Sequence, residues 1–205
     1  MSTAQKHIPL FADNTLVIAS HNKGKIAEIE AMVAQLGITV LSAGDFNIPE
    51  PEETGTTFAE NATLKACHTT SRCSKAALAD DSGLVIPALG GAPGIYSARW
   101  AGPDKDFSIA FSRIQKELGD KDHAAYFTCV LALNIPNGQT HLFEGRIHGT
   151  LHFPPRGTNG FGYDPIFIPN GYEKTFAEIP ATEKNRISHR ALAFEQLVSF
   201  LKANT

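Results

Sequence analysis

The sequence lacks any long hydrophobic run. No apolar stretch of the 205-residue chain reaches the length of about 18 residues that indicates a membrane-spanning helix. Residues 1–13 have mixed polarity and lack the apolar core of a secretory signal, so we expect them to form a loose extension. These features argue against a membrane protein and against a secreted one.

Cysteine is scarce, and its number is odd. The three cysteines, Cys67, Cys73 and Cys129, follow neither a disulfide framework nor the spacing of zinc ligands. We therefore expect a cytoplasmic protein without structural disulfides.

An excess of positive charge is also lacking. The chain has 18 Lys and Arg against 21 Asp and Glu, which gives a formal net charge of -3. Proteins that hold DNA or RNA through many phosphates carry a basic footprint, so we expect no nucleic-acid partner. A small anion in a local basic pocket remains compatible with this composition.

What the chain does contain suits one globular domain. The composition, 42% hydrophobic and 19% charged, is that of an ordinary soluble protein. A length of 205 residues is enough to bury a sizeable core, and we interpret residues 1–205 as a single domain.

Two adjacent acids, Asp80 and Asp81, are the most informative feature. They follow the apolar residues 76–79 and precede Ser82-Gly83 and a second apolar run, residues 84–86. The pattern predicts two short strands with the acids at a strand end, where the Ser-Gly pair turns the chain. Adjacent carboxylates raise each other's pKa, and a divalent metal would offset their repulsion. The alternative is a solvated turn in which Asp and Ser cap their own backbone.

A strand, a tight loop and a helix are predicted near the N-terminus. The β-prone residues 15–20 precede the loop 21–25, and apolar side chains then recur at helical spacing up to Gly37. Such a loop places backbone N–H groups and a helix N-terminus where phosphate binds, and Lys23 and Lys25 add positive charge. The alternative is a surface turn that carries lysines.

An acidic, proline-containing loop covers residues 49–55, and a long helix follows it. Thr57 and Glu60 form a capping box that predicts the helix start. Asn61 and Lys65 then share one face of this helix. A charge run such as the loop usually marks a solvated surface.

The second half predicts more strands. A helix with one apolar face spans residues 107–118, a β-prone run covers 124–134, and Asn137-Gly138 predicts a hairpin into strands at 141–144 and 146–153. Crossover helices followed by a meander indicate an α/β fold. We expect an elongated mixed β-sheet with flanking helices, in two lobes around a central cleft that binds the ligand.

Residues 154–165 form a long glycine-rich loop, and loops of this length are usually functional. Phe161 can stack on a planar ring, and Asp164 can accept hydrogen bonds. The alternative is that Phe161 and Tyr163 fill the core.

The last helix is predicted to start at Ser188, with His189 and Arg190 in its first turn. Cations there oppose the helix dipole, so a docked anion would explain them. The alternative is that Arg190 pairs with a nearby carboxylate.

Seven motifs occur in one order between about Thr15 and Leu201. They are Ser20-His-Asn-Lys-Gly-Lys25, Glu52-Glu-Thr-Gly55, Phe58-x-x-Asn61-Ala-x-Leu-Lys65-Ala, Ala79-Asp-Asp-Ser-Gly83, Gly90-Gly-Ala-Pro-Gly-Ile-Tyr-Ser-Ala-Arg99, Gly160-Phe-Gly-Tyr-Asp-Pro165 and Ser188-His-Arg190. Together they resemble the RdgB-type inosine triphosphate pyrophosphatase family, which removes deaminated purine nucleoside triphosphates from the nucleotide pool.

The resemblance implies a homodimer and Mg²⁺-dependent hydrolysis of ITP, dITP or XTP to the monophosphate and pyrophosphate. By this resemblance Asp81 is the general base and a metal ligand, and Glu52, with Glu53 as a second candidate, helps to hold Mg²⁺. The implied substrate contacts are Ser20, His21, Asn22, Lys23, Gly24, Lys25, Lys65 and Ser82 toward the triphosphate, and Phe161, Gly162, Tyr163, Asp164, Lys184, His189 and Arg190 toward the base and sugar.

Two other hypotheses remain open at this point. One is a pyrophosphatase of the related Maf type, acting on modified pyrimidine triphosphates. The other is a non-catalytic module that binds nucleotides. The motifs around Phe161 and Ser188 argue against the first, and the intact acids Glu52, Asp80 and Asp81 argue against the second.

Overall fold

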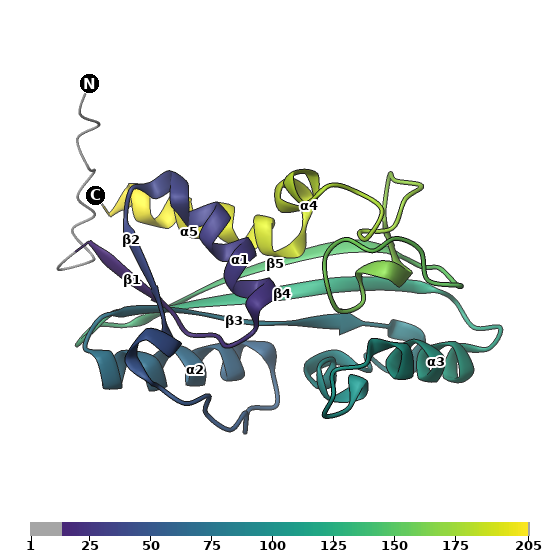
Figure 1. Cartoon of the computed structure of the whole chain (residues 1–205), viewed down its shortest axis with the longest axis horizontal. Helices are drawn as coiled ribbons and strands as arrows, with labels where there is room; N and C mark the ends of the chain where they lie inside the picture. The colour runs from purple at the N-terminus through teal and green to yellow at the C-terminus, as the bar shows by residue number, and fades with distance from the viewer. Residues whose placement is uncertain (1–13, 205) are drawn as a thin grey trace. The chain divides into compact units, whose positions relative to one another are not determined.

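The computed structural model describes residues 14–204, so the extension expected over residues 1–13 lies outside the described residues. Figure 1 shows a mixed α/β fold, as the sequence predicted. The strands and longer helices are β1 (Thr15–Ile18), α1 (Lys23–Val33), β2 (Thr39–Ser42), α2 (Phe58–Cys73), β3 (Ala76–Val85), α3 (Phe107–Leu118), β4 (Ala124–Asn134), β5 (Thr140–Leu151), β6 (Phe167–Pro169), α4 (Ala181–Ile187) and α5 (His189–Ala203).

The six strands form one sheet in the order β2-β1-β3-β4-β5-β6. Strand β1 pairs in parallel with β2 and with β3, and β6 pairs antiparallel with β5. Parallel neighbours need a crossover connection, and α1 lies between β1 and β2 in the chain while α2 lies between β2 and β3. The sheet is therefore mixed, as expected.

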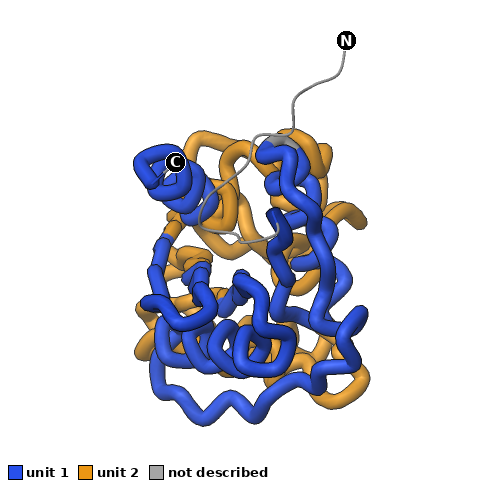
Figure 2. Tube along the Cα trace, turned by 90° about the vertical axis from the view of Figure 1, so that its left-hand side faces the viewer, with its two compact units in different colours: residues 1–81, 130–144, 193–205 blue, residues 82–129, 145–192 orange. Residues whose placement is uncertain are grey.

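The described chain divides into two compact units, coloured separately in Figure 2. The first takes in residues 14–81, 130–144 and 193–204, and the second takes in residues 82–129 and 145–192. Three of the boundaries fall inside β3, β4 and β5 and the fourth falls inside α5, so each of these elements contributes residues to both units. The central cleft expected between two lobes stays a prediction.

Each unit has its own apolar cluster. One cluster of the first unit, between α2 and the sheet, consists mostly of alanines, including Ala62 and Ala66 on α2 and Ala79 on β3, and small side chains let a helix approach a sheet closely. The second unit is filled by larger side chains, among them Phe127, Phe167, Phe176, Ile114 and Leu118. The last two lie on the predicted apolar face of α3, which spans residues 107–118 as expected.

Two predicted strand boundaries are wrong. Residues 76–85 form one continuous strand, so the acids lie inside β3 and Ser82-Gly83 does not turn the chain. The strand continues because β1 and β4 flank it and because lysines neutralise both acids. Likewise, the strands predicted at 141–144 and 146–153 are joined in a single strand, β5, which ends at Leu151.

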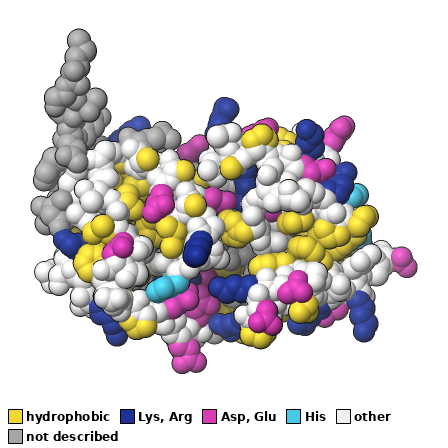
Figure 3. All heavy atoms as spheres, viewed as in Figure 1, with side chains coloured by type: hydrophobic (Ala, Val, Ile, Leu, Met, Phe, Trp, Pro, Cys, Tyr) yellow, Lys and Arg dark blue, Asp and Glu magenta, His cyan; other side chains and the backbone are white. Residues whose placement is uncertain are grey.

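Charged side chains of both signs are interspersed on the face shown in Figure 3. No extended surface of one sign is visible on that face, in keeping with the small net charge. Within residues 14–204, every helix is too short or too polar to cross a bilayer.

The start of α2 was predicted correctly. The Thr57 side chain accepts a hydrogen bond from the Glu60 N–H, and the Glu60 carboxylate accepts from the Thr57 N–H at 3.2 Å. This carboxylate also accepts from the backbone and hydroxyl of Thr56, and these bonds hold the pKa of Glu60 below its ordinary value. The capping box thus fixes the junction between the acidic loop and α2.

We predict that Thr57→Ala lowers the free energy of unfolding by about 0.5–2 kcal/mol, because the Glu60 N–H loses its cap. Urea denaturation measures this difference. Thr57→Ser keeps the hydroxyl and is the matched control. Equal stability of the Ala and Ser variants would show that the capping box contributes nothing.

Candidate active site

Lys65 is the centre of a buried charge cluster in the first unit. Its Nζ lies 2.8 Å from Oδ1 of Asp81 and 2.9 Å from Oε1 of Glu53. The Lys65 side chain is 6% exposed and that of Asp81 is 8% exposed. Residues from α2, β3 and the acidic loop therefore meet at one ammonium group.

Burial changes the pKa of Asp81, the most buried acid of this cluster. It raises the pKa of Asp81, while the ammonium groups of Lys65 and Lys25 oppose the shift and the Glu53 carboxylate adds to it. Burial by itself lowers the pKa of Lys65, but the charges of Asp81 and Glu53 outweigh it, and the net shift is upward. Asp81 is therefore a buried carboxyl group with a raised proton affinity beside a lysine that stays charged.

Asp80 has a different lysine partner. Its Oδ1 lies 2.5 Å from Nζ of Lys25 in α1. Successive strand residues point to opposite faces of a sheet, and Figure 1 shows α1 and α2 on opposite faces. The adjacent acids therefore each meet a lysine from a different helix, and the repulsion expected between them is avoided.

The acidic loop runs along α2. We call residues 49–55 the acidic strap. Its Pro49 carbonyl lies 3.0 Å from Nε2 of His68, its Glu53 contacts Lys65, and the Gly55 N–H donates to Oδ1 of Asn61 at 2.9 Å. As the strap proceeds, its partners move back along the helix, so the strap lies antiparallel to α2.

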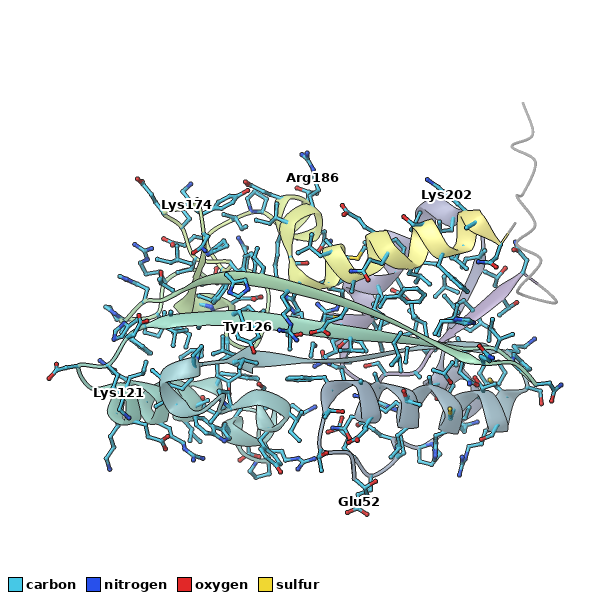
Figure 4. All side chains as sticks on the ribbon, turned by 180° about the vertical axis from the view of Figure 1, so that it is seen from behind. Glu52, Lys121, Tyr126, Lys174, Arg186 and Lys202 are labelled. Atoms are coloured by element: carbon cyan, nitrogen blue, oxygen red, sulfur yellow. The ribbon has the colours of Figure 1, made fainter. Side chains whose placement is uncertain are left out.

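The strap presents its two central acids differently. Glu53 is half-buried beside Lys65, whereas Glu52 is exposed and points away from the ribbon in Figure 4. The sequence placed Glu52 first as a metal ligand. In the structure it is Glu53 that lies with Asp81 around one ammonium group.

Side-chain hydrogen bonds fix the conformation of the loop after β1. Ser20 Oγ accepts from the Asn22 N–H, and Asn22 Oδ1 caps α1 by accepting from the N–H groups of Gly24 and Lys25. The side chains of His21 and Lys23 are exposed on this loop. The predicted strand, loop and helix are thus present, with Asn22 as the N-cap.

The carboxylates around Asp81 are of the kind that can help to hold a magnesium ion. Oδ2 of Asp81 is buried and has no hydrogen-bond partner among the described residues, so this oxygen is available to a ligand. Within residues 14–204 no group of three or more His, Cys, Asp or Glu side chains could hold a metal. Mg²⁺ usually takes one or two carboxylates and completes its shell with substrate phosphates and water, and Asp81 with Glu53 offers that number.

A second buried charge cluster lies in the second unit, around Asp164. Lys184 Nζ lies 2.5 Å from Oδ2 of Asp164, and the Phe161 N–H donates to the same oxygen at 2.8 Å. Gly160 has a φ of +71°, and a Cβ on it would collide with this carboxylate. Only glycine therefore lets the loop close over Asp164.

Two cationic side chains lie near the Phe161 ring, which is only partly buried. Nζ of Lys184 lies 4.7 Å from the ring centroid, and the Arg190 guanidinium carbon lies 5.9 Å from it. Arg190 also donates to Oγ of Ser82 at 3.1 Å, and Ser82 directly follows Asp81 in β3. Four of the predicted substrate contacts, Phe161, Lys184, Arg190 and Asp164, are therefore brought together.

The other predicted residues of this group lie in or near the core. The Tyr163 hydroxyl donates to the Ser97 carbonyl at 2.8 Å, and burial raises its pKa. The His189 ring is 4% exposed and stacks on Phe127, with centroids 4.8 Å apart and an interplanar angle of 13°. Gly162 adopts a positive φ between Phe161 and Tyr163 and lets them point into different surroundings.

The Ser188 side chain accepts from the Ala191 N–H at 3.2 Å, as expected for the N-cap of α5. Sequence reasoning gave no role to Gly55, to Gly160 or to the Asn61 carboxamide. The two glycines stood in recognised motifs, but their closeness to Asn61 and Asp164 depends on the fold.

Comparison with known proteins gives one consistent result. The model of the Ham1 family matches residues 16–200. A protein of Rhodospirillum centenum named dITP/XTP pyrophosphatase is 53% identical over 196 residues, which is 92% of this chain and 95% of that protein. A protein of Caulobacter vibrioides with the same name is 50% identical over 189 residues, covering 91% of this chain and 97% of the relative.

Solved structures of Ham1 proteins are also similar to this chain. The Staphylococcus aureus Ham1 protein superposes with a TM-score of 0.84 at 38% identity, covering 93% of this chain and all of that one. A HAM1 protein from Coxiella burnetii gives a TM-score of 0.81 at 40% identity, covering 92% of this chain and 98% of its own. The resemblance drawn from the seven motifs is confirmed, and the chain belongs to the Ham1 family.

Proposed function

We propose that this chain is a nucleoside triphosphate pyrophosphatase that hydrolyses deaminated purine nucleoside triphosphates, namely dITP, ITP and XTP. The products are the monophosphate and pyrophosphate, and the reaction depends on Mg²⁺. The observation that carries the proposal is the buried Asp81 carboxyl group beside Lys65 and Glu53, with one oxygen left for a ligand. The names of the relatives, dITP/XTP pyrophosphatase, support the same substrate class.

Asp81 acts as the general base in this proposal. Its Oδ2 accepts a proton from a water molecule, and the water oxygen attacks the α-phosphorus. The bond from that phosphorus to the bridging oxygen of the β-phosphate breaks, and pyrophosphate leaves with its electron pair. A raised pKa suits this role, because a base works best when its pKa approaches the working pH.

Charge neutralisation is the other half of phosphoryl chemistry. Asp81 and Glu53 are the residues that would hold Mg²⁺, which supplies positive charge to the phosphate oxygens and to the leaving pyrophosphate. Lys65 is fixed between these two acids. It adds a permanent positive charge to the same cluster.

The α1 N-terminus suits the phosphate chain. Its first-turn N–H groups and the helix dipole attract anions, and the Asn22 cap holds the loop in place. Lys23 and His21 are exposed on this loop, and Lys25 is partly exposed while it contacts Asp80. We assign the triphosphate to Ser20, His21, Asn22, Lys23, Gly24, Lys25 and Lys65.

We assign the base to the Asp164 cluster. The Phe161 ring offers a stacking face, and Lys184 and His189 are donors that suit the 6-oxo oxygen of a deaminated purine. Adenine carries an amino group at that position and would leave a buried donor unpaired, at a cost of about 1–3 kcal/mol. The proposed site therefore favours 6-oxo purines over ATP.

On the resemblance of the sequence motifs we also propose that the enzyme is a cytoplasmic homodimer. The Maf-type and non-catalytic alternatives are separated from the main proposal by the substrate panel below.

We predict that the purified protein releases pyrophosphate from dITP, ITP and XTP faster than from ATP, dTTP or CTP, and only with Mg²⁺. Asp81→Asn removes the base and should lower turnover by a factor of about 100 to 10,000 while the variant still binds nucleotide. A coupled assay of pyrophosphate release measures the substrate preference, the Mg²⁺ dependence and the loss of turnover.

Preferential hydrolysis of a modified pyrimidine triphosphate would favour the Maf-type alternative. Binding without turnover would favour the non-catalytic module. Near wild-type turnover by Asp81→Asn would remove Asp81 from its role.

The placement of the strap acids gives a second prediction. Glu53→Gln should raise the Mg²⁺ concentration needed for half-maximal activity by about tenfold or more, because a carboxylate beside Asp81 is lost. Glu52→Gln, its sequence neighbour and matched control, should have the smaller effect, because that side chain points away. Mg²⁺ titrations of dITP hydrolysis compare the two, and the reverse order would assign the metal to Glu52.

Base selectivity gives a third prediction. His189→Phe keeps a ring stacked on Phe127 but removes the ring nitrogens, so the preference for ITP over ATP should narrow by about tenfold. The ratio of kcat/KM for the two nucleotides measures this change. His148→Phe, on an exposed histidine of the same unit, is the control. An equal loss on both nucleotides would place base recognition elsewhere.

A further inference from the structure

Asn61 lies at the end of the acidic strap. It is fully buried in α2, one helical turn before Lys65. Its Oδ1 accepts from the Gly55 N–H at 2.9 Å, and two residues earlier in the strap Glu53 contacts Lys65. The hydrogen bond to the Asn61 carboxamide therefore attaches the strap to α2 only two residues after Glu53.

The contact leaves no spare room. A Cβ on Gly55 would lie 2.6 Å from Asn61 Oδ1 and 2.7 Å from Glu60 Cβ, well inside van der Waals contact. Glycine at this position is thus required by close approach and not by a positive φ. The backbone of the strap touches α2 here, and any larger residue would lift it away.

Stability alone does not explain Asn61. Its Nδ2 is buried and has no hydrogen-bond partner among the described residues. A buried unpaired donor costs about 1–3 kcal/mol, so an asparagine that satisfies only one end of its amide is a poor choice for a core position. The hydrogen bond that Asn61 does make joins its Oδ1 to the strap.

We propose that Asn61 is a positioning residue that sets the Glu53 carboxylate beside Lys65 and Asp81 by holding Gly55 against α2. An extended chain advances about 3.3 Å per residue, so Gly55 and Glu53 are separated by only two such steps. A shift of the strap at Gly55 is therefore transmitted to Glu53, whose contact with Lys65 is 2.9 Å long. His68 and Pro49 hold the other end of the strap, which confines the effect of Asn61 to the segment that carries the acid.

This inference rests on the proposed function, in which Glu53 helps to hold the metal. It predicts that Asn61→Ala weakens Mn²⁺ binding about tenfold, as measured by the EPR signal of the free ion without nucleotide. The kcat/KM for dITP should fall about ten- to a hundredfold in the same variant, with the order of preference among purine nucleotides unchanged.

Gly55→Ala disturbs the same contact from the strap and leaves the helix residue intact, so it should reproduce both effects. Gly44→Ala is the matched control, because a Cβ there meets only Ser42 Oγ at 3.4 Å. Thermal unfolding without metal verifies that each variant is folded.

The decisive comparison is made in the Glu53→Gln background. If Asn61 acts through Glu53, adding Asn61→Ala to Glu53→Gln should change Mn²⁺ binding by less than about twofold. A full additional loss in the double variant, or wild-type Mn²⁺ affinity in both Asn61→Ala and Gly55→Ala, would overturn the inference. Absence of dITP hydrolysis by the wild-type protein would instead refute the proposed function, so the two failures are distinguishable.

Discussion

A lysine ammonium held between two carboxylates is the interaction on which the first unit's site depends. Lys65 comes from α2, Asp81 from β3 and Glu53 from the acidic strap, and both contacts of the Lys65 ammonium group are shorter than 3 Å. Removing one partner from a buried ion pair costs about 3–5 kcal/mol, because the remaining charge is left uncompensated. The cluster therefore orders three separate segments of the chain, and its lysine opposes the rise in the pKa of Asp81 that burial causes.

The second unit also contains a buried pair of a lysine and a carboxylate. Asp164 is buried with Lys184, and the backbone N–H of Phe161 donates to the same carboxylate oxygen. Buried ion pairs are weak evidence for stability, since an apolar replacement often serves as well. Both pairs involve residues that the motifs single out, and in the proposed function these residues hold the charged and planar parts of the nucleotide.

Features with a local cause were predictable from the sequence. The Thr57–Glu60 capping box, the apolar face of α3, the Ser188 cap and the strand-loop-helix around Asn22 all depend on residues within a few positions of each other. The family motifs added the residues that the fold gathers around Lys65 and Phe161. Their roles in catalysis and binding stay predictions.

Features that depend on distant partners were not predictable. The acids looked like a strand end because Ser82-Gly83 is a turn signal, and the lysines that neutralise them inside the strand lie 55 and 16 residues away in the chain. The sequence also did not show which of Glu52 and Glu53 lies beside Lys65. Which of two neighbouring side chains faces the helix is decided by how Pro49 and Gly55 are anchored, and not by their own chemistry.

The alternation of β3 also constrains how this chain can evolve. Asp80 faces the lysine of one helix and Asp81 faces the lysine of the other. Because side chains alternate with a period of two, inserting or deleting one residue upstream in the strand would exchange the two faces. The acid pair would survive in the sequence, but each carboxylate would meet the wrong lysine. Length changes are therefore excluded from this strand and confined to the loops, whereas substitutions that keep the register remain available.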